Sequence, residues 1–237
     1  MATLSGKDIQ ERLISFHDIG VSLPDVLGQA KQRRVPSALG EALEAGKIVL
    51  DPMPVLEDAL TSASIDVRLG NIIEMVNIPM EITKIDGQTV IRPYVTWYNR
   101  ESVAQLLGND HDRGFQIIKH GVNIKFRLKD GEFIQLPRGV LITPYTLEVV
   151  CVPYGLVARM EGRSSLARVG IVPHVASPRI DPGFIGYMTM EVSNVGSGDV
   201  CLQQGQRIAA LSFDELLTPA QPYHSYKGEA GRFSGQD

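Results

Sequence analysis

The sequence predicts a mainly β protein with short helices near its N-terminus, its strands arranged as an antiparallel barrel or sandwich. From residue 48 onward, short runs rich in β-branched and aromatic residues recur between turn residues, as is typical of such folds. Asp-Gly pairs at 86–87 and 130–131 and an Asp-Pro-Gly at 181–183 supply the turns. The first 50 residues instead space their apolar side chains at helical intervals.

Each expected strand is a short apolar run bounded by glycine, proline or aspartate. Prolines are expected at strand ends, because proline has no N–H for a β ladder; this applies to Pro137, Pro144, Pro153 and Pro173. The expected strands cover residues 65–69, 89–91, 122–128, 139–143, 147–152, 156–160, 187–192 and 208–213.

Two short helices are expected in the N-terminal segment, over residues 7–14 and 37–47. Gly46 stands where the second helix would end. The polar, basic stretch 29–34 between them is expected to be a solvated connection. The chain therefore divides into a helical extension over residues 1–50, packed on a β domain over residues 51–217, and a polar, glycine-rich tail over residues 218–237.

Composition narrows the classes of function. A formal net charge of -4 argues against a broad nucleic-acid surface, although a few arginines could still hold a small polyanion. Cys151 and Cys201 are the two cysteines, which excludes a disulfide scaffold and fits a reducing compartment. No apolar run approaches the ~20 residues of a membrane span. We expect a cytoplasmic protein with neither a membrane nor nucleic acid as a partner.

The first candidate site is residues 161–170, Glu-Gly-Arg-Ser-Ser-Leu-Ala-Arg-Val-Gly, directly after an expected strand. A short helix start with two hydroxyls (Ser164, Ser165) and two arginines (Arg163, Arg168) is suited to an anion such as phosphate. The plainer interpretation is a helical turn capped by serine, with both arginines solvated.

The second candidate is Glu191, on the strand expected over residues 187–192. Strand alternation places Met188 and Met190 on one face and Thr189 and Glu191 on the other. If the second face lines a pocket, the Glu191 carboxylate is a candidate general acid and base. The alternative is a surface glutamate on the solvated side of a sheet.

Together these passages resemble the dCTP deaminase branch of the dCTP deaminase/trimeric dUTPase superfamily. The resemblance runs from about residue 37 to the C-terminus and is carried by the segments 43–48, 64–71, 162–168, 174–175, 179–184 and 210–213, with Glu191 and Gly205. It implies a distorted antiparallel β-barrel of the dUTPase-like type that binds nucleotides. It also implies a homotrimer with active sites at the subunit interfaces and a C-terminal tail that closes over the site.

The resemblance further implies a role for each matching residue. Glu191 would be the catalytic acid and base, with Ser164, Arg168 and the backbone carbonyl of Ser177 ordering the attacking water. The substrate-binding residues would be Arg163 and Ser165 for the triphosphate, Arg179, Ile180 and Asp181 for the deoxyribose and base edge, and Tyr226, Lys227 and Glu229 in the tail. Mg²⁺ would accompany the triphosphate, with no metal ligand supplied by the protein.

The expected reaction is the metal-independent deamination of dCTP to dUTP and ammonia, feeding dUMP and dTTP synthesis. Zinc is not expected, because no histidine is followed by glutamate two positions later and the two cysteines lie far apart. Pro178 and Arg179 should make the loop before Asp181 stiff and cationic. In this the loop resembles that of deaminases that stop at dUTP, and differs from the bifunctional relatives, which carry glycine and an aromatic residue there. The alternatives are a dUTP diphosphatase, or a bifunctional enzyme in which Asp181 positions a second water, and a non-catalytic nucleotide-binding regulator.

Overall fold

The computed structural model describes residues 2–78, 80–85, 88–93, 115–118, 121–129, 131–176 and 178–220, with side chains described outside 75–126. The helices are α1 (Gly6–Arg12), the 3-10 helix η1 (His17–Ile19), α2 (Leu23–Lys31), α3 (Ser37–Glu44), α4 (Leu56–Ala59) and α6 (Ser164–Ala167). The strands are β1 (Leu13–Ile14), β2 (Ile48–Asp51), β3 (Ile65–Ile78), β4 (Met80–Ile85), β5 (Gln88–Pro93), β6 (Phe115–Ile118), β7 (Gly121–Arg127), β8 (Phe133–Leu136), β9 (Leu141–Cys151), β10 (Leu156–Gly162), β11 (Ile171–Val172), β12 (Arg179–Ile180), β13 (Ile185–Thr189), β14 (Val192–Asn194), β15 (Val200–Gln203) and β16 (Arg207–Glu215).

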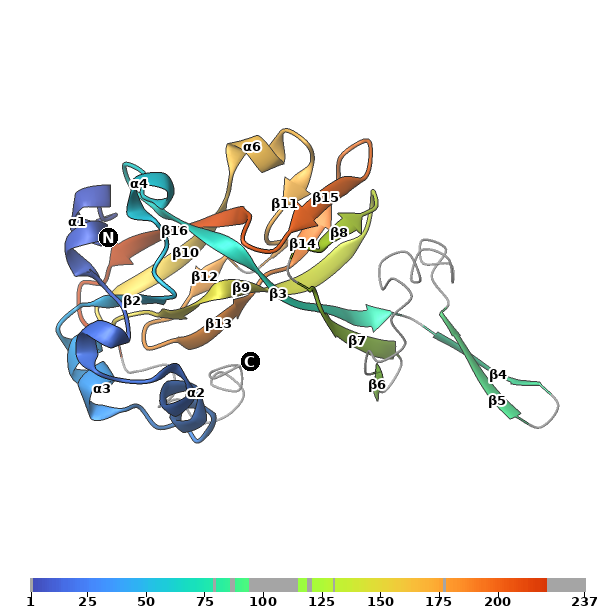
Figure 1. Cartoon of the computed structure of the whole chain (residues 1–237), viewed down its shortest axis with the longest axis horizontal. Helices are drawn as coiled ribbons and strands as arrows, with labels where there is room; N and C mark the ends of the chain where they lie inside the picture. The colour runs from blue at the N-terminus through green and yellow to red at the C-terminus, as the bar shows by residue number, and fades with distance from the viewer. Residues whose placement is uncertain are drawn as a thin grey trace.

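The predicted mainly β class is confirmed. The main sheet follows the order β1-β2-β9-β3-β16-β10-β12, and β13 and β14 also pair with β9. The neighbours are antiparallel except for β1 and β2, which run parallel. Among the described strands, this pairing does not close into a ring, so the expected barrel is an open sheet. Figure 1 shows α6 beside β11, away from the N-terminal helices.

The N-terminal residues are part of the hydrophobic core. Leu4 and Ile9 are buried in the same cluster as the side chains of β3, β10 and β16. A second cluster places Phe16 and Val26 against Val149 of β9 and Ile185 of β13. The helices α2 and α3 therefore cover one face of β9 and β13 (Figure 1). No helix in the described part of the chain is long and apolar enough to cross a membrane.

Both expected N-terminal helices form, as α1 and α3, and Gly46 ends the second with a φ of 77° while its N–H donates to Leu43 O. The sequence analysis missed α2. The stretch expected to begin a solvated connection at residue 29 instead completes that helix. Burial of Val26 and Ala30, four residues apart on one helical face, stabilises α2 through packing that the local composition does not reveal.

Prolines 137, 153 and 173 follow strands, as expected, but Pro144 lies inside one. The two strands predicted over residues 139–143 and 147–152 are a single strand, β9. On one side of β9 the partner changes at this point, from Val192 of β14 opposite Ile142 to Thr189 of β13 opposite Tyr145. The Pro144 carbonyl accepts from the Met190 N–H on this side of β9. The N–H that proline lacks would point to the same side, where β9 passes from one partner strand to the other. The strand therefore loses little by containing proline.

Candidate functional site

The first candidate segment leaves β10 at Gly162 and forms the single turn α6. Arg163 occupies the N-cap position, and no side chain among the described residues caps the turn, so the plainer interpretation of a serine cap is wrong. Ser164 and Ser165 are exposed. Gly170 ends the segment with a φ of 89°, and a Cβ there would lie 2.2 Å from the Gly196 backbone. The fold therefore leaves both serine hydroxyls uncommitted to the helix end.

Arg163 turns back across the sheet to a buried carboxylate on β3. Its Nε lies 2.9 Å from Asp66 Oδ2, and its Nη1 donates to Arg207 O at 3.0 Å. Arg207 Nη1 lies 3.6 Å from the same Asp66 oxygen. Burial raises the pKa of Asp66, and the charges of Arg163 and Arg207 oppose that rise. The arginine predicted to bind triphosphate is thus already oriented by a charged partner.

Glu191 follows β13 and is half-buried, while Met188, Met190 and Val192 are buried, as the predicted alternation requires. The backbone N–H groups of Val175 and Ala176 both donate to Glu191 Oε2, each at 3.2 Å. The carboxylate is therefore held through one oxygen, which leaves Oε1 without a hydrogen bond among the described residues. A carboxylate oriented in this way can exchange a proton at Oε1.

The loop that carries Asp181 is held against β10. Pro178 O accepts from the Met160 N–H at 2.7 Å, and Arg179 and Ile180 form β12 beside Arg159 and Ala158. Arg179 Nη2 lies 3.1 Å from Asp181 Oδ1, and Arg179 Nε donates to the same oxygen at 3.1 Å. The Asp181 carboxylate is therefore paired with the arginine two residues before it.

The structure brings the β10–α6 turn and Glu191 together at the end of β10, through Pro173. A Cβ on Gly162 would lie 3.5 Å from Pro173 Cδ, and Pro173 O accepts from the Glu191 N–H at 3.2 Å. Within the described residues, no hydrogen bond or ion pair joins the Glu191 side chain to Ser164 or Arg168. Four predicted site residues lie outside the described residues: Ser177, Tyr226, Lys227 and Glu229.

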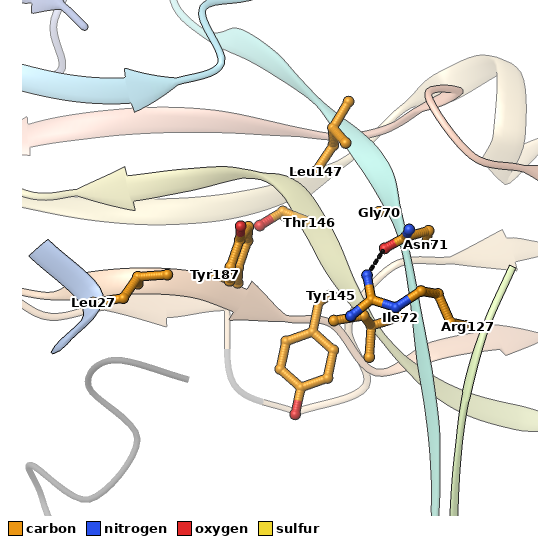
Figure 2. Close-up of a pocket in the computed structure, with 9 residues that line it drawn as sticks. All are labelled: Leu27, Gly70, Asn71, Ile72, Arg127, Tyr145, Thr146, Leu147 and Tyr187. Carbon is orange, nitrogen blue, oxygen red and sulfur yellow. Dashed lines mark hydrogen bonds between the residues drawn. The ribbon is translucent and has the colours of Figure 1, made fainter. Parts of the chain in front are cut away.

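A separate cavity of about 440 Å³ lies between α2 and the sheet. Figure 2 shows Tyr145 and Tyr187 on its walls and Arg127 donating through Nη1 to Asn71 Oδ1, at 3.0 Å. The hydroxyl of Thr146 is already used, donating to Glu148 O and accepting from the Met188 N–H. None of the residues predicted from the sequence lines this cavity.

The sequence analysis did not assign a role to Asp66 or Arg207. Ile65, Val67 and Leu69 are buried on one face of β3, so alternation places Asp66 on the opposite face, where a solvated carboxylate is expected; the burial of Asp66 is not predicted by that pattern. Its place in the segment 64–71, which carries the family resemblance, is the signal that could have drawn attention to it. Arg207 follows the turn at Gly205 and gives no comparable signal.

The chain is similar to several known proteins. It is 34% identical over 184 residues to the "dCTP deaminase, dUMP-forming" of Methanobrevibacter smithii, covering 77% of this chain and 80% of that protein. It is 33% identical over 188 residues to the "dCTP deaminase" of Shewanella amazonensis, covering 79% of this chain and 86% of that protein. The solved dCTP deaminase of Agrobacterium tumefaciens is 19% identical, with a TM-score of 0.45 over 75% of this chain and 44% of that chain.

Most of the chain matches the model of one protein family. Residues 36–216 match the family described as dCTP deaminase-like, and this range contains β10, α6, the Asp181 loop and Glu191. The match covers well over half of the chain and agrees with the identity to the Methanobrevibacter and Shewanella proteins. The chain therefore belongs to the dCTP deaminase-like family.

Proposed function

We propose that this protein hydrolyses the exocyclic amine of dCTP, giving dUTP and ammonia and so feeding dUMP and dTTP synthesis. The observation that carries the proposal is the Glu191 carboxylate, fixed through Oε2 by two backbone N–H groups beside the β10–α6 turn. The names of the relatives, which specify a dCTP deaminase, support the deamination of dCTP.

In the proposed mechanism Glu191 moves two protons. A water ordered by the Ser164 hydroxyl and Arg168 gives a proton to Glu191 Oε1 as its oxygen attacks C4 of cytosine, and Glu191 passes that proton to N3. The tetrahedral carbon then collapses to a carbonyl as Glu191 carries the second water proton to the departing amine. One water is consumed and one ammonia leaves. The Ser177 carbonyl, and the tail residues Tyr226, Lys227 and Glu229, stay predictions of this proposal.

The substrate's phosphates would lie against the β10–α6 turn, on Arg163 and Ser165, while Ile180 and its loop would hold the deoxyribose. Mg²⁺ would enter on the triphosphate and neutralise part of its charge. Asp66, the carboxylate beside Arg163, is already paired with two arginines.

A second candidate is the bifunctional reaction that gives dUMP and pyrophosphate, which the name of the Methanobrevibacter relative favours. Cleavage at the α-phosphate would need the Asp181 carboxylate to orient another water. The Arg179 guanidinium engages Oδ1 of that carboxylate at 3.1 Å and counters its charge, which supports dUTP as the end product.

The direct test is to incubate the protein with dCTP, and separately with dUTP, and to separate the products by ion-exchange chromatography. We expect equal amounts of dUTP and ammonia from dCTP and no comparable loss of dUTP. Formation of dUMP and pyrophosphate at the rate of ammonia release would establish the bifunctional reaction instead. Absence of ammonia from dCTP would contradict both.

Treatment with a zinc-selective chelator, followed by restoration of Mg²⁺, should leave the deamination rate unchanged. The reason is that Glu191 and an ordered water replace the metal-bound hydroxide of the zinc deaminases. The rate of ammonia release before and after treatment measures this. Activity that returns only when Zn²⁺ is added would contradict the metal-independent mechanism.

The proposed enzyme is a homotrimer, because the family resemblance places its sites between subunits. Light scattering should therefore give about three times the chain mass of 26.0 kDa. A monomer with full deaminase activity would contradict the shared site.

A further inference from the structure

Two arginines share one buried carboxylate at the edge of the proposed site. The Asp66 side chain is 6% exposed, whereas those of Arg163 and Arg207 are 23% and 41% exposed. In the part of the chain that the structure describes, Asp66 is the carboxylate that pairs with either arginine, and no other does. The cluster therefore carries one uncompensated positive charge at the protein surface.

The contacts hold both guanidinium groups in place and leave donors free. Arg163 uses Nε on Asp66 and Nη1 on the Arg207 carbonyl. Arg207 uses Nη1, which donates to Asp58 O and faces Asp66. Each guanidinium has five N–H groups, so Nη2 of both residues and Nε of Arg207 keep donors without a partner among the described residues. Fixed, unused donors of this kind suit an oxyanion.

The strand register places Arg207 beside the β10–α6 turn. The last pair between β10 and β16 joins Gly162 to Ala209, and Arg207 is the first residue of β16. Arg207 therefore lies next to the end of β10, where the exposed residues Ser164 and Ser165 follow. Because the whole protein has a net charge of -4, a polyanion can be held only where cations gather locally.

We propose that Arg207 is a second phosphate-binding residue, which acts with Arg163 on the terminal phosphate of a nucleoside triphosphate, and that Asp66 is a positioning residue for both arginines. The identity of the nucleotide rests on the proposed function, whereas the affinity of the cluster for a polyphosphate does not. Because Arg207 would act on the terminal phosphate, it should favour the binding of triphosphates over monophosphates.

The test compares Arg207→Gln with a matched control, Arg159→Gln. Arg159 also lies on the β10–β16 pair, has the same 41% exposed side chain, and pairs with Asp214 at 3.0 Å, but it is the central residue of β10, opposite Ser212, away from the turn. Calorimetry would measure the affinities of the intact protein for inorganic tripolyphosphate, dCTP and dCMP. Arg207→Gln should weaken tripolyphosphate and dCTP at least tenfold and dCMP by less than twofold.

Arg207→Lys keeps the charge and should retain most of the affinity for tripolyphosphate and dCTP. Arg159→Gln should leave the affinities for tripolyphosphate, dCTP and dCMP unchanged. Arg207→Gln retains the Arg163–Asp66 pair, so its melting temperature should stay close to that of the parent protein. Equal tripolyphosphate affinity in the two glutamine variants would overturn the proposal, as would an equal loss of dCTP and dCMP binding. If Arg207→Gln weakens tripolyphosphate binding as expected but the parent protein does not deaminate dCTP, the anion site is supported and the proposed function is overturned.

Discussion

Replacing Glu191 with glutamine should lower the deamination rate by about 10²- to 10⁴-fold while leaving dCTP binding nearly unchanged. The amide oxygen of glutamine can still accept the N–H groups of Val175 and Ala176, which lie 3.2 Å from Glu191 Oε2. The side chain therefore keeps its orientation and volume. Its NH₂ group, in the place of Oε1, cannot accept a proton from water.

Ammonia release at saturating dCTP measures the rate, and calorimetry measures binding. Glu41→Gln is the matched control, because Glu41 is an exposed glutamate of α3, outside the predicted site, and the substitution removes the same charge. Its rate should stay within twofold of the parent protein. If Glu191→Gln were also within a few-fold of the parent rate, another group would have to carry the protons.

Replacing Arg68 with alanine should lower the free energy of unfolding by about 3–5 kcal/mol, because it leaves a buried carboxylate without its counter-charge. Glu148 is 0% exposed, and Arg68 Nε donates to its Oε1 at 2.5 Å. The Arg68 backbone N–H donates to Oε2 at 2.9 Å, a contact that survives the substitution. Urea denaturation at pH 7 would measure the loss.

The loss should depend on pH in a defined direction. Burial already raises the pKa of Glu148, and the bonds from Arg68 oppose that rise. Without the guanidinium the pKa rises further, so the folded state binds more protons than the unfolded state. Stability of the Arg68→Ala variant should therefore fall as the pH increases from below the ordinary value of 4.5 through the raised folded pKa.

Adding Glu148→Gln to the Arg68→Ala variant should recover part of the stability and remove this pH dependence, since no buried charge is left. Lys7→Ala is the surface control: its ion pair with Glu11, at 3.9 Å between exposed side chains, should contribute nothing measurable. A change of less than about 1 kcal/mol in Arg68→Ala would show that water or another group solvates Glu148.

The sequence alone predicted the helices, a helix end and the buried face of a strand, because each of these depends on residues that are neighbours in the chain. Periodicity separated the N-terminal helices from the strands, and Gly46 ended a helix as expected. Alternation placed Met188 and Met190 in the core and Glu191 off that face. The resemblance of the short motifs identified the family to which the chain belongs.

The tertiary structure decided the contacts that orient the candidate site. Asp66, Arg163 and Arg207 come from three different strands or strand ends, and they meet because β16 lies between β3 and β10. The anchoring of Glu191 by the N–H groups of Val175 and Ala176 depends likewise on how a loop returns to β13. A local pattern determines which face of a strand is apolar, because side-chain direction repeats every two residues. Strand order and register depend on the packing of the whole core, so only the folded chain determines which charges pair.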